Sequence, residues 1–214
     1  IVCNLDYRLT EAAPLMDKGE SVAHEQFVLT EYAFPVVADL TSVAGKVEKD
    51  ERIAYTVISA NGVKVTFNND NGFISYLDVD GKPMMQDDSQ LLPDFWRPVT
   101  DNDYGAGIQN RLKAWKEPGL KLTALNHEVK DGQVIVTANY DMSAVQAKLD
   151  LTYTISNTGA VLVNQKMTAT KDAKVAPLFR FGMALHALHA ADDEHSIVHH
   201  RQRALHFTGK VDVP

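Results

Sequence analysis

The chain has 214 residues, of which 45% are hydrophobic and 23% charged, and this composition suits one globular domain or two small ones. Its net charge of −7 argues against a nucleic-acid partner, and no apolar run reaches the length that spans a membrane. Cys3 is the only cysteine, so an intrachain disulfide is impossible and the redox compartment stays open. Because the sequence begins at Ile1 without an initiator Met or a signal-peptide pattern, we expect an excised piece of a longer polypeptide.

The first part of the chain carries strand signals that fade near Leu29. Pro35 follows, and the charge-rich stretch 46–52 should be solvated. We therefore predict that residues 1–33 are the remnant of one β-domain and that residues 34–53 are a linker. A strand or two cannot bury a face alone, so the apolar residues of the remnant need a partner surface.

The next segment alternates in the manner of antiparallel strands. Apolar residues recur at every second position in four runs: Val63, Val65 and Phe67; Val134, Val136, Ala138 and Tyr140; Leu149, Leu151, Tyr153 and Ile155; Val161 and Val163. Asp80-Gly81 suits a tight hairpin turn, because both positions tolerate positive φ. These are meander signals rather than βαβ signals, and they predict an all-β fold with an antiparallel β-sandwich over residues 54–185.

Helix signals are weak by comparison. Residues 106–116 fit a turn or two of helix, which Pro118-Gly119 would end. Trp115 would anchor this short segment.

The most informative stretch runs from Asp94 to Gly105. Two aromatic residues precede a polar group that is too polar for a core and too ordered for a linker. One interpretation is a structural turn in which Arg97 balances the carboxylates; another is a sugar-facing wall with a tryptophan as a stacking face. The candidate substrate-binding residues are Trp96, Arg97, Asp101, Asn102, Asp103 and Trp115. A catalytic pair of Asp101 and Asp103 is disfavoured, since residues two apart converge only in a loop.

The same stretch resembles a known family. Trp96-Arg97-Pro98, followed by Asp101–Gly105 and the basic-aromatic run Arg111–Trp115, is similar to the C-terminal part of β-galactosidases of glycoside hydrolase family 2. Further segments resemble the last domain of that family: Val63–Phe67, Asn71-Gly72, Leu77–Pro83 and Arg180–Met183. Others resemble the end of the immunoglobulin-like domain before it: Leu5–Leu9, Gly19-Glu20 and Phe27–Leu29. The resemblance covers residues 1–185.

The resemblance implies a fold and a parent activity. Residues 54–185 would be the first part of a galactose-mutarotase-like supersandwich, and residues 1–33 the end of the immunoglobulin-like domain. The parent hydrolyses terminal β-D-galactosides in carbohydrate metabolism with two glutamates in a TIM barrel, and its carboxyl groups lie about 5–5.5 Å apart. This chain has no βα alternation to build a barrel, so we expect no catalytic residue in it and no hydrolysis by the chain alone. It would brace or wall the active site and the oligomer.

The expected partners and ions follow from the same resemblance. The partners would be the rest of the parent polypeptide, with its barrel and immunoglobulin-like domains, and galactosides; exposed strand edges also predict self-association. The family often uses divalent or sodium ions outside this region, so we expect no cofactor here. The resemblance suggests a bacterial cytoplasm or periplasm without choosing between them.

Two alternatives stay open at this point. The chain could be a free-standing carbohydrate-binding or mutarotase-like module, or a purely structural interaction domain. Mutarotation needs a general acid and a general base over one sugar. His127 and Glu128 are adjacent, but neighbours on a strand face opposite ways.

The family pattern stops after Met183. We predict that residues 186–214, which hold six of the eight histidines, form a diverged, solvated tail. The pairs His186/His189 and His195/His199 have helical spacing for a metal site. No second firm helix, cysteine partner or metal-binding motif supports such a site, so we expect none.

Overall fold

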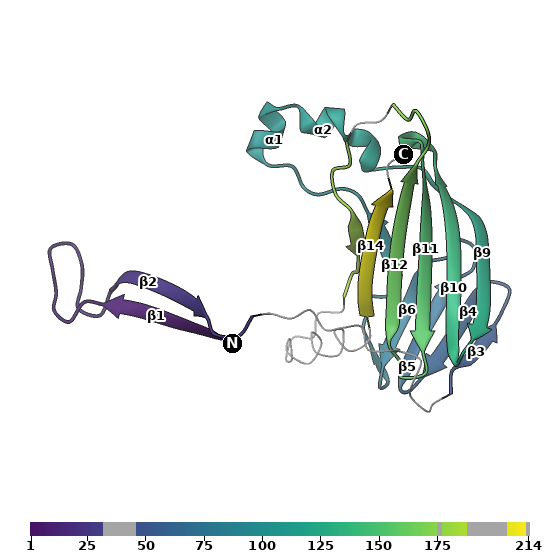
Figure 1. The fold of residues 1–214 in the computed structure, drawn as a ribbon, viewed down its shortest axis with the longest axis horizontal. Helices are drawn as coiled ribbons and strands as arrows, with labels where there is room; N and C mark the ends of the chain where they lie inside the picture. Colours follow the sequence, from purple (N-terminus) through teal and green to yellow (C-terminus); the bar gives the residue numbers. More distant parts are fainter. Residues whose placement is uncertain (32–45, 175–176, 188–204, 213–214) are drawn as a thin grey trace. The chain divides into compact units, whose positions relative to one another are not determined.

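The computed structural model describes residues 1–31, 46–174, 177–187 and 205–212 (Figure 1). The chain folds as two compact units, residues 1–38 and 39–214. No helix in the described ranges is long and apolar enough to cross a membrane.

The first unit is a β-hairpin of two antiparallel strands, β1 (Val2–Arg8) and β2 (Ser21–Val28). One face is polar, and on it the Gln26 side-chain amide donates to Asn4 Oδ1 at 2.7 Å. The other face carries Leu5, Tyr7 and Phe27, which are 41%, 53% and 47% exposed. The strand signals of this segment correspond to two strands, and within this unit their apolar face stays uncovered, as expected for an isolated hairpin.

In its described residues the second unit contains two five-stranded sheets and one short strand pair. The first sheet has the order β3 (Glu48–Glu51), β4 (Tyr55–Ala60), β5 (Val63–Asn68), β6 (Ile74–Val79) and β7 (Lys82–Pro83). The second has the order β14 (Leu205–Asp212), β12 (Val161–Ala169), β11 (Ala147–Ser156), β10 (Gln133–Met142) and β9 (Leu120–Lys130). The short pair is β8 (Leu92–Asp94) with β13 (Gly182–Ala184). Every pairing is antiparallel except that of β12 with β14.

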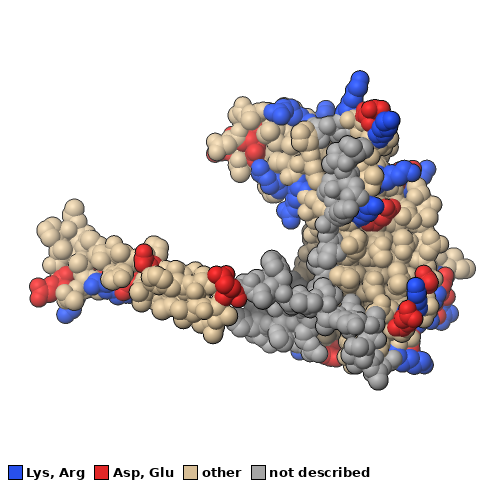
Figure 2. Space-filling model, viewed as in Figure 1, with Lys and Arg blue, Asp and Glu red and all other residues tan. Residues whose placement is uncertain are grey.

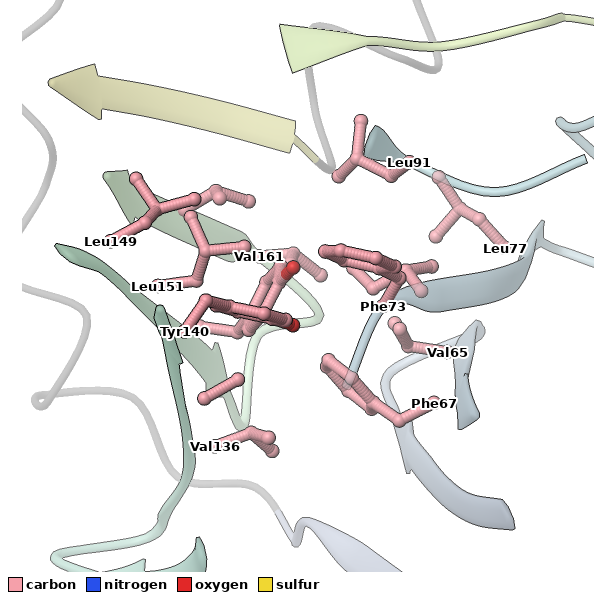
Figure 3. Close-up of a cluster of buried hydrophobic side chains, with 14 of the residues drawn as sticks. Val65, Phe67, Phe73, Leu77, Leu91, Val136, Tyr140, Leu149, Leu151 and Val161 are labelled. Atoms are coloured by element: carbon pink, nitrogen blue, oxygen red, sulfur yellow. The ribbon is translucent and has the colours of Figure 1, made fainter. Parts of the chain in front are cut away.

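The inner faces of the two sheets form one hydrophobic core (Figure 3). Phe67 and Tyr153 meet edge to face with their ring centroids 5.0 Å apart, and Phe73 stacks on Tyr140 at 5.2 Å. Residues at every second position of β5, β10, β11 and β12 are buried, which confirms the alternation seen in the sequence. The all-β sandwich is therefore confirmed.

Part of the expected linker belongs to the sandwich. Residues Glu48–Glu51 form the edge strand β3 and pair with β4. Lys49 Nζ lies 2.7 Å from Glu51 Oε2, and Arg52 Nη2 lies 2.9 Å from Asp50 Oδ2. Residues two apart share one face of a strand, so this charge pattern suits an edge strand as well as a solvated loop.

The expected solvated tail is also wrong in part. Ala187 bridges to Met85, and the backbone of Leu205–Asp212 adds to the second sheet as the parallel strand β14. The sequence of this strand has apolar residues at 205, 207 and 211, and in the pairing register these lie beside Val161, Val163 and Met167 of β12. This period-two signal predicts a strand in the part of the chain that was expected to be tail.

The helical segment begins earlier than residue 106. It consists of α1 (Asp101–Gly105), α2 (Ile108–Arg111) and the 3-10 turn η1 (Lys113–Trp115). The polar group at Asp101–Asp103, for which the sequence suggested a structural turn or a sugar-facing wall, is the first turn of α1. Thr100 is the N-cap of this helix and forms a capping box with Asp103, and the Thr100–Asp103 spacing is the local sequence signal for this helix start.

Candidate functional site

The stretch from Asp94 to Gly105 leaves the core through Phe95. Phe95 is 2% exposed, and its ring lies 5.9 Å from the Trp115 ring and 6.0 Å from the Phe181 ring. Burial of such side chains stabilises the fold by about 1.5–3 kcal/mol each. Trp115 is 4% exposed and belongs to the same core. The helical segment is therefore held at both ends by buried aromatic rings.

Trp96 and Arg97 meet a second segment of the chain at Phe179. The Trp96 and Phe179 ring centroids are 5.0 Å apart in an edge arrangement. The guanidinium carbon of Arg97 lies 4.4 Å from the centroid of the same Phe179 ring, within the range of a cation–π contact. One phenyl ring thus fixes two of the predicted site residues.

The Arg97 guanidinium also binds a carboxylate with two nitrogens. Nη1 lies 2.7 Å from Asp103 Oδ2 and Nη2 lies 3.2 Å from Asp103 Oδ1, and Nη1 donates to the Pro98 carbonyl as well. The backbone N–H of Thr100 donates to Asp103 Oδ2 at 2.8 Å. Arg97 first, and Thr100 second, lower the pKa of Asp103 to about 2. The expected balance between Arg97 and a carboxylate of this group is confirmed for Asp103.

A second arginine–aspartate pair joins the same two segments. Arg180 Nε lies 3.1 Å from Asp94 Oδ2, and the other carboxylate oxygen of Asp94 accepts from the Trp96 backbone N–H at 3.0 Å. Directly beside this pair, β8 and β13 exchange ladder bonds with Gly182 opposite Asp94. The loop before α1 is therefore tied to residues 179–184 by backbone, charge and ring contacts together.

The predicted site residues do not form one surface. Trp96, Arg97 and Asp103 come together around Phe179, whereas Trp115 lies in the core against Phe95. Asp101 and Asn102 are exposed on α1, and so is Tyr104, which is 57% exposed.

Three residues of the cluster were missed from sequence: Asp94, Phe179 and Arg180. Asp94 begins the informative stretch and Arg180 begins a segment of the family resemblance, but neither position by itself indicates a role at the site. Nothing local in the sequence pairs them, because the contacts join segments that are far apart along the chain.

The chemistry available to this cluster is limited by its own pairing. A carboxylate with a pKa of about 2 stays ionised near neutral pH, so Asp103 is unsuited to proton donation. Both guanidinium groups are engaged by aspartates. The cluster is thus built to hold a loop in place, although its arginine side chains stay partly exposed, 38% for Arg97 and 47% for Arg180.

A second candidate site among the described residues would need a cluster of charged or metal-ligating side chains. Figure 2 shows lysine and arginine side chains around the helical segment with acidic side chains among them. Among the described residues no group of three or more His, Cys, Asp and Glu side chains is arranged to hold a metal ion. His186 lies in the described part, whereas His189, His195 and His199 lie outside it.

Comparison with known proteins gives the family. The family model described as "Beta galactosidase small chain" matches residues 59–194, which extends beyond the point where the family pattern was expected to stop. A β-galactosidase of Priestia megaterium is 28% identical over 199 residues, which cover 90% of this chain. A β-galactosidase of Lactobacillus delbrueckii subsp. bulgaricus is 27% identical over 193 residues, which cover 86% of this chain.

Both alignments cover 18% of the relative's own length, so the chain corresponds to a minor part of these proteins. The family model, however, matches more than half of the chain, and it falls on the sandwich and on the loop that carries the Arg97 cluster. The chain belongs to the β-galactosidase small-chain family.

Proposed function

We propose that this chain is a non-catalytic portion of a β-galactosidase, and that it braces or walls an active site built by other parts of that enzyme. The parent reaction would be the hydrolysis of terminal β-D-galactosides. The observation that carries the proposal is the Arg97–Asp103–Phe179 cluster, which holds the start of α1 against residues 179–184 within the family match. Such a cluster serves positioning better than proton transfer, since its acid stays ionised.

The domain plan belongs to the same proposal. Residues 1–33 would be the end of an immunoglobulin-like domain, and the body of the small-chain sandwich would start before residue 54, because β3 is part of its sheet. The uncovered apolar face of the hairpin would then pack against the missing strands of the first domain.

A hydrolysis assay tests the non-catalytic role. The purified chain should release no chromophore from a chromogenic β-galactoside above a buffer control. Turnover that scales with the amount of the chain, and that survives a second purification, would refute the proposal.

A galactose titration followed by amide NMR tests the contact with sugar. A bracing role predicts no saturable shift near Trp96, whereas a free-standing binding module predicts shifts that the Arg97→Ala variant weakens. A saturable response in the wild type would replace the bracing role with sugar binding.

Self-association is a separate part of the proposal. Strand β9 lies at the end of its sheet in the described part of the chain, and Val129 at its C-terminal end is 60% exposed. Unpaired edges with exposed apolar residues favour pairing between copies. Light scattering should give a mass that rises with concentration; a constant monomer mass would contradict the proposal.

A further inference from the structure

The sequence contains two Asn-Gly dipeptides, Asn61-Gly62 and Asn71-Gly72, and both lie in turns. Asn-Gly is the dipeptide most open to spontaneous loss of ammonia, because a glycine nitrogen meets little steric hindrance when it attacks the preceding side chain. The two sites share this local chemistry and differ in their surroundings, so the fold decides which of them can react.

The Asn71 site is locked on every side. The Gly72 N–H donates to the Asn68 carbonyl at 2.8 Å, so the attacking nitrogen is engaged. The Asn71 side chain donates to Gln90 at 3.1 Å and accepts from the Phe73 N–H at 3.1 Å. Gly72 is also buried. Cyclisation here would require several hydrogen bonds to break within the packed structure.

The Asn71 carbonyl is engaged as well. It accepts the Tyr140 hydroxyl at 2.7 Å, and a Cβ at Gly72 would lie 2.7 Å from that hydroxyl oxygen. The backbone on both sides of the Asn71–Gly72 peptide therefore has little room to rotate toward the side chain.

The Asn61 site is more exposed, and its constraints fall on the Gly62 Cα and carbonyl rather than on the attacking nitrogen. The Gly62 carbonyl accepts the Asp80 N–H at 2.7 Å, and a Cβ at Gly62 would clash with the Asp80 carboxylate. Asn61 and Gly62 form the exposed turn between β4 and β5, with φ values of +46° and +80°. Within the described residues the Gly62 N–H makes no hydrogen bond. The side-chain amide of Asn61 makes one bond, in which it donates to the Thr158 carbonyl at 2.9 Å.

We propose that Asn61 is a site of spontaneous deamidation in the folded protein. The Gly62 nitrogen loses its proton and attacks Asn61 Cγ, the bond from Cγ to Nδ2 breaks, and ammonia leaves with that proton. The resulting succinimide ring is then opened by water at either of its two C–N bonds. The products are aspartate, or isoaspartate with the side-chain carbon in the backbone.

The modification falls on a contact between the two sheets. The Asn61–Thr158 bond links the β4–β5 turn to the β11–β12 turn, and a Cβ at Gly159 would lie 2.8 Å from Val63 Cγ2. Deamidation replaces the donor with a carboxylate that faces the Thr158 carbonyl. It also places a second acid near Asp80, whose carboxylate packs against Gly62. Loss of the Asn61–Thr158 hydrogen bond weakens the contact between the two sheets at this end of the sandwich.

Mass spectrometry of the aged protein tests the proposal. The full chain is held folded in mildly alkaline buffer and then digested with trypsin, whose cleavage after Lys64 separates the two sites. We expect the peptide with Asn61 to gain the mass of an amide-to-acid change and isoaspartate. Conversion at Asn71 should be slower by about tenfold or more, since its nitrogen and side chain are held.

A denatured control separates fold from sequence. In urea both Asn-Gly sites should convert at similar rates, because the surroundings that distinguish them are gone. Conversion of Asn71 as fast as Asn61 in the folded chain would overturn the proposal. So would conversion of Asn61 no faster than that of the slowest-reacting other asparagines of the folded chain.

The consequence has its own measurement in the Asn61→Asp variant. Loss of one hydrogen bond predicts a thermal midpoint lower by about 2–4 °C. An unchanged thermal midpoint would overturn the claim that deamidation weakens the contact between the two turns.

Discussion

Two buried tyrosines on neighbouring strands predict opposite responses to the same substitution. Tyr140 on β10 is 2% exposed and donates its hydroxyl to the Asn71 carbonyl at 2.7 Å. Tyr153 on β11 is fully buried, and in the described part of the chain no partner lies within hydrogen-bonding distance of its hydroxyl. Removal of the hydroxyl therefore breaks a bond in one case and relieves an unpaired polar group in the other.

The magnitudes follow from the two surroundings. Tyr140→Phe leaves the Asn71 carbonyl without its donor, at a cost of about 1–3 kcal/mol in the free energy of unfolding. Tyr153→Phe removes a buried hydroxyl that has no partner, so we expect no loss and a gain of up to about 1 kcal/mol. Both variants keep the aromatic ring, which stacks on Phe73 in the case of Tyr140 and meets Phe67 edge to face in the case of Tyr153, so the packing terms cancel to first order.

Urea unfolding of the two variants beside the wild type measures this difference. Burial raises the pKa of both phenols, so neither ionises near neutral pH and charge does not enter the comparison. Equal slopes with denaturant would show that the midpoints report stability. A loss of stability in Tyr153→Phe as large as that in Tyr140→Phe would show that the Tyr153 hydroxyl is not an unpaired group.

Three further predictions use matched or titratable groups. Gly159→Ala should lower the free energy of unfolding by about 3 kcal/mol or more, because φ is +84° and the new Cβ would lie within 3 Å of the Val63 side chain and the Ala60 carbonyl. Gly132→Ala should lower it by about 1 kcal/mol, since the space around Gly132 is open. Equal losses in the two variants would contradict this prediction. Burial lowers the pKa of His127, so the folded state resists protonation of this side chain. The free energy of unfolding should therefore fall as pH drops below about 6.5, and it should fall less in His127→Leu. A wild-type stability that does not change with pH in this range would contradict the prediction. Arg97→Lys should raise the pKa of Asp103 from about 2 toward its ordinary value, as measured by a carboxyl NMR titration. The stability that Asp103 contributes above about pH 4, and that is lost toward pH 2, should then become smaller. An unchanged pKa of Asp103 would count against the two-nitrogen contact.

The sandwich could be predicted because its information is local. Alternation at every second residue of β5, β10, β11 and β12 sets which side chains are buried, and these strands appear where the pattern places them. Asp80 and Gly81 both have positive φ at the predicted hairpin turn. Such features depend on a few neighbouring residues and need no knowledge of the rest of the chain.

The errors arose where two local signals competed. The charges of Glu48–Glu51 suggest a solvated linker, yet the same residues have the i, i+2 ion pairing of an edge strand. The helix starts earlier than expected because the acids after Thr100, which suggest a polar turn, include the Asp103 of a capping box. In both places the spacing of the polar residues, rather than their composition, indicates the structure.

The candidate site was only partly predictable because its contacts are long-range. Trp96, Arg97 and Asp103 stand out in sequence, but Phe179 and Arg180 come from a segment far along the chain. No periodicity or spacing connects the two segments. The pairing of β8 with β13, which brings them together, is a property of the folded sandwich.

The contacts within the Arg97 cluster determine which of its residues are available to contact another part of an enzyme. Arg97 is engaged by Asp103 of α1 and Arg180 by Asp94 of β8, and Phe179 contacts Trp96 and Arg97. Polar groups already paired give little to a new partner, because each existing bond must be broken first. The exposed side chains of α1, Tyr104 foremost, carry no such cost. If the chain braces a galactoside site, we therefore expect the contact through α1, with the arginine–aspartate pairs setting where that helix stands.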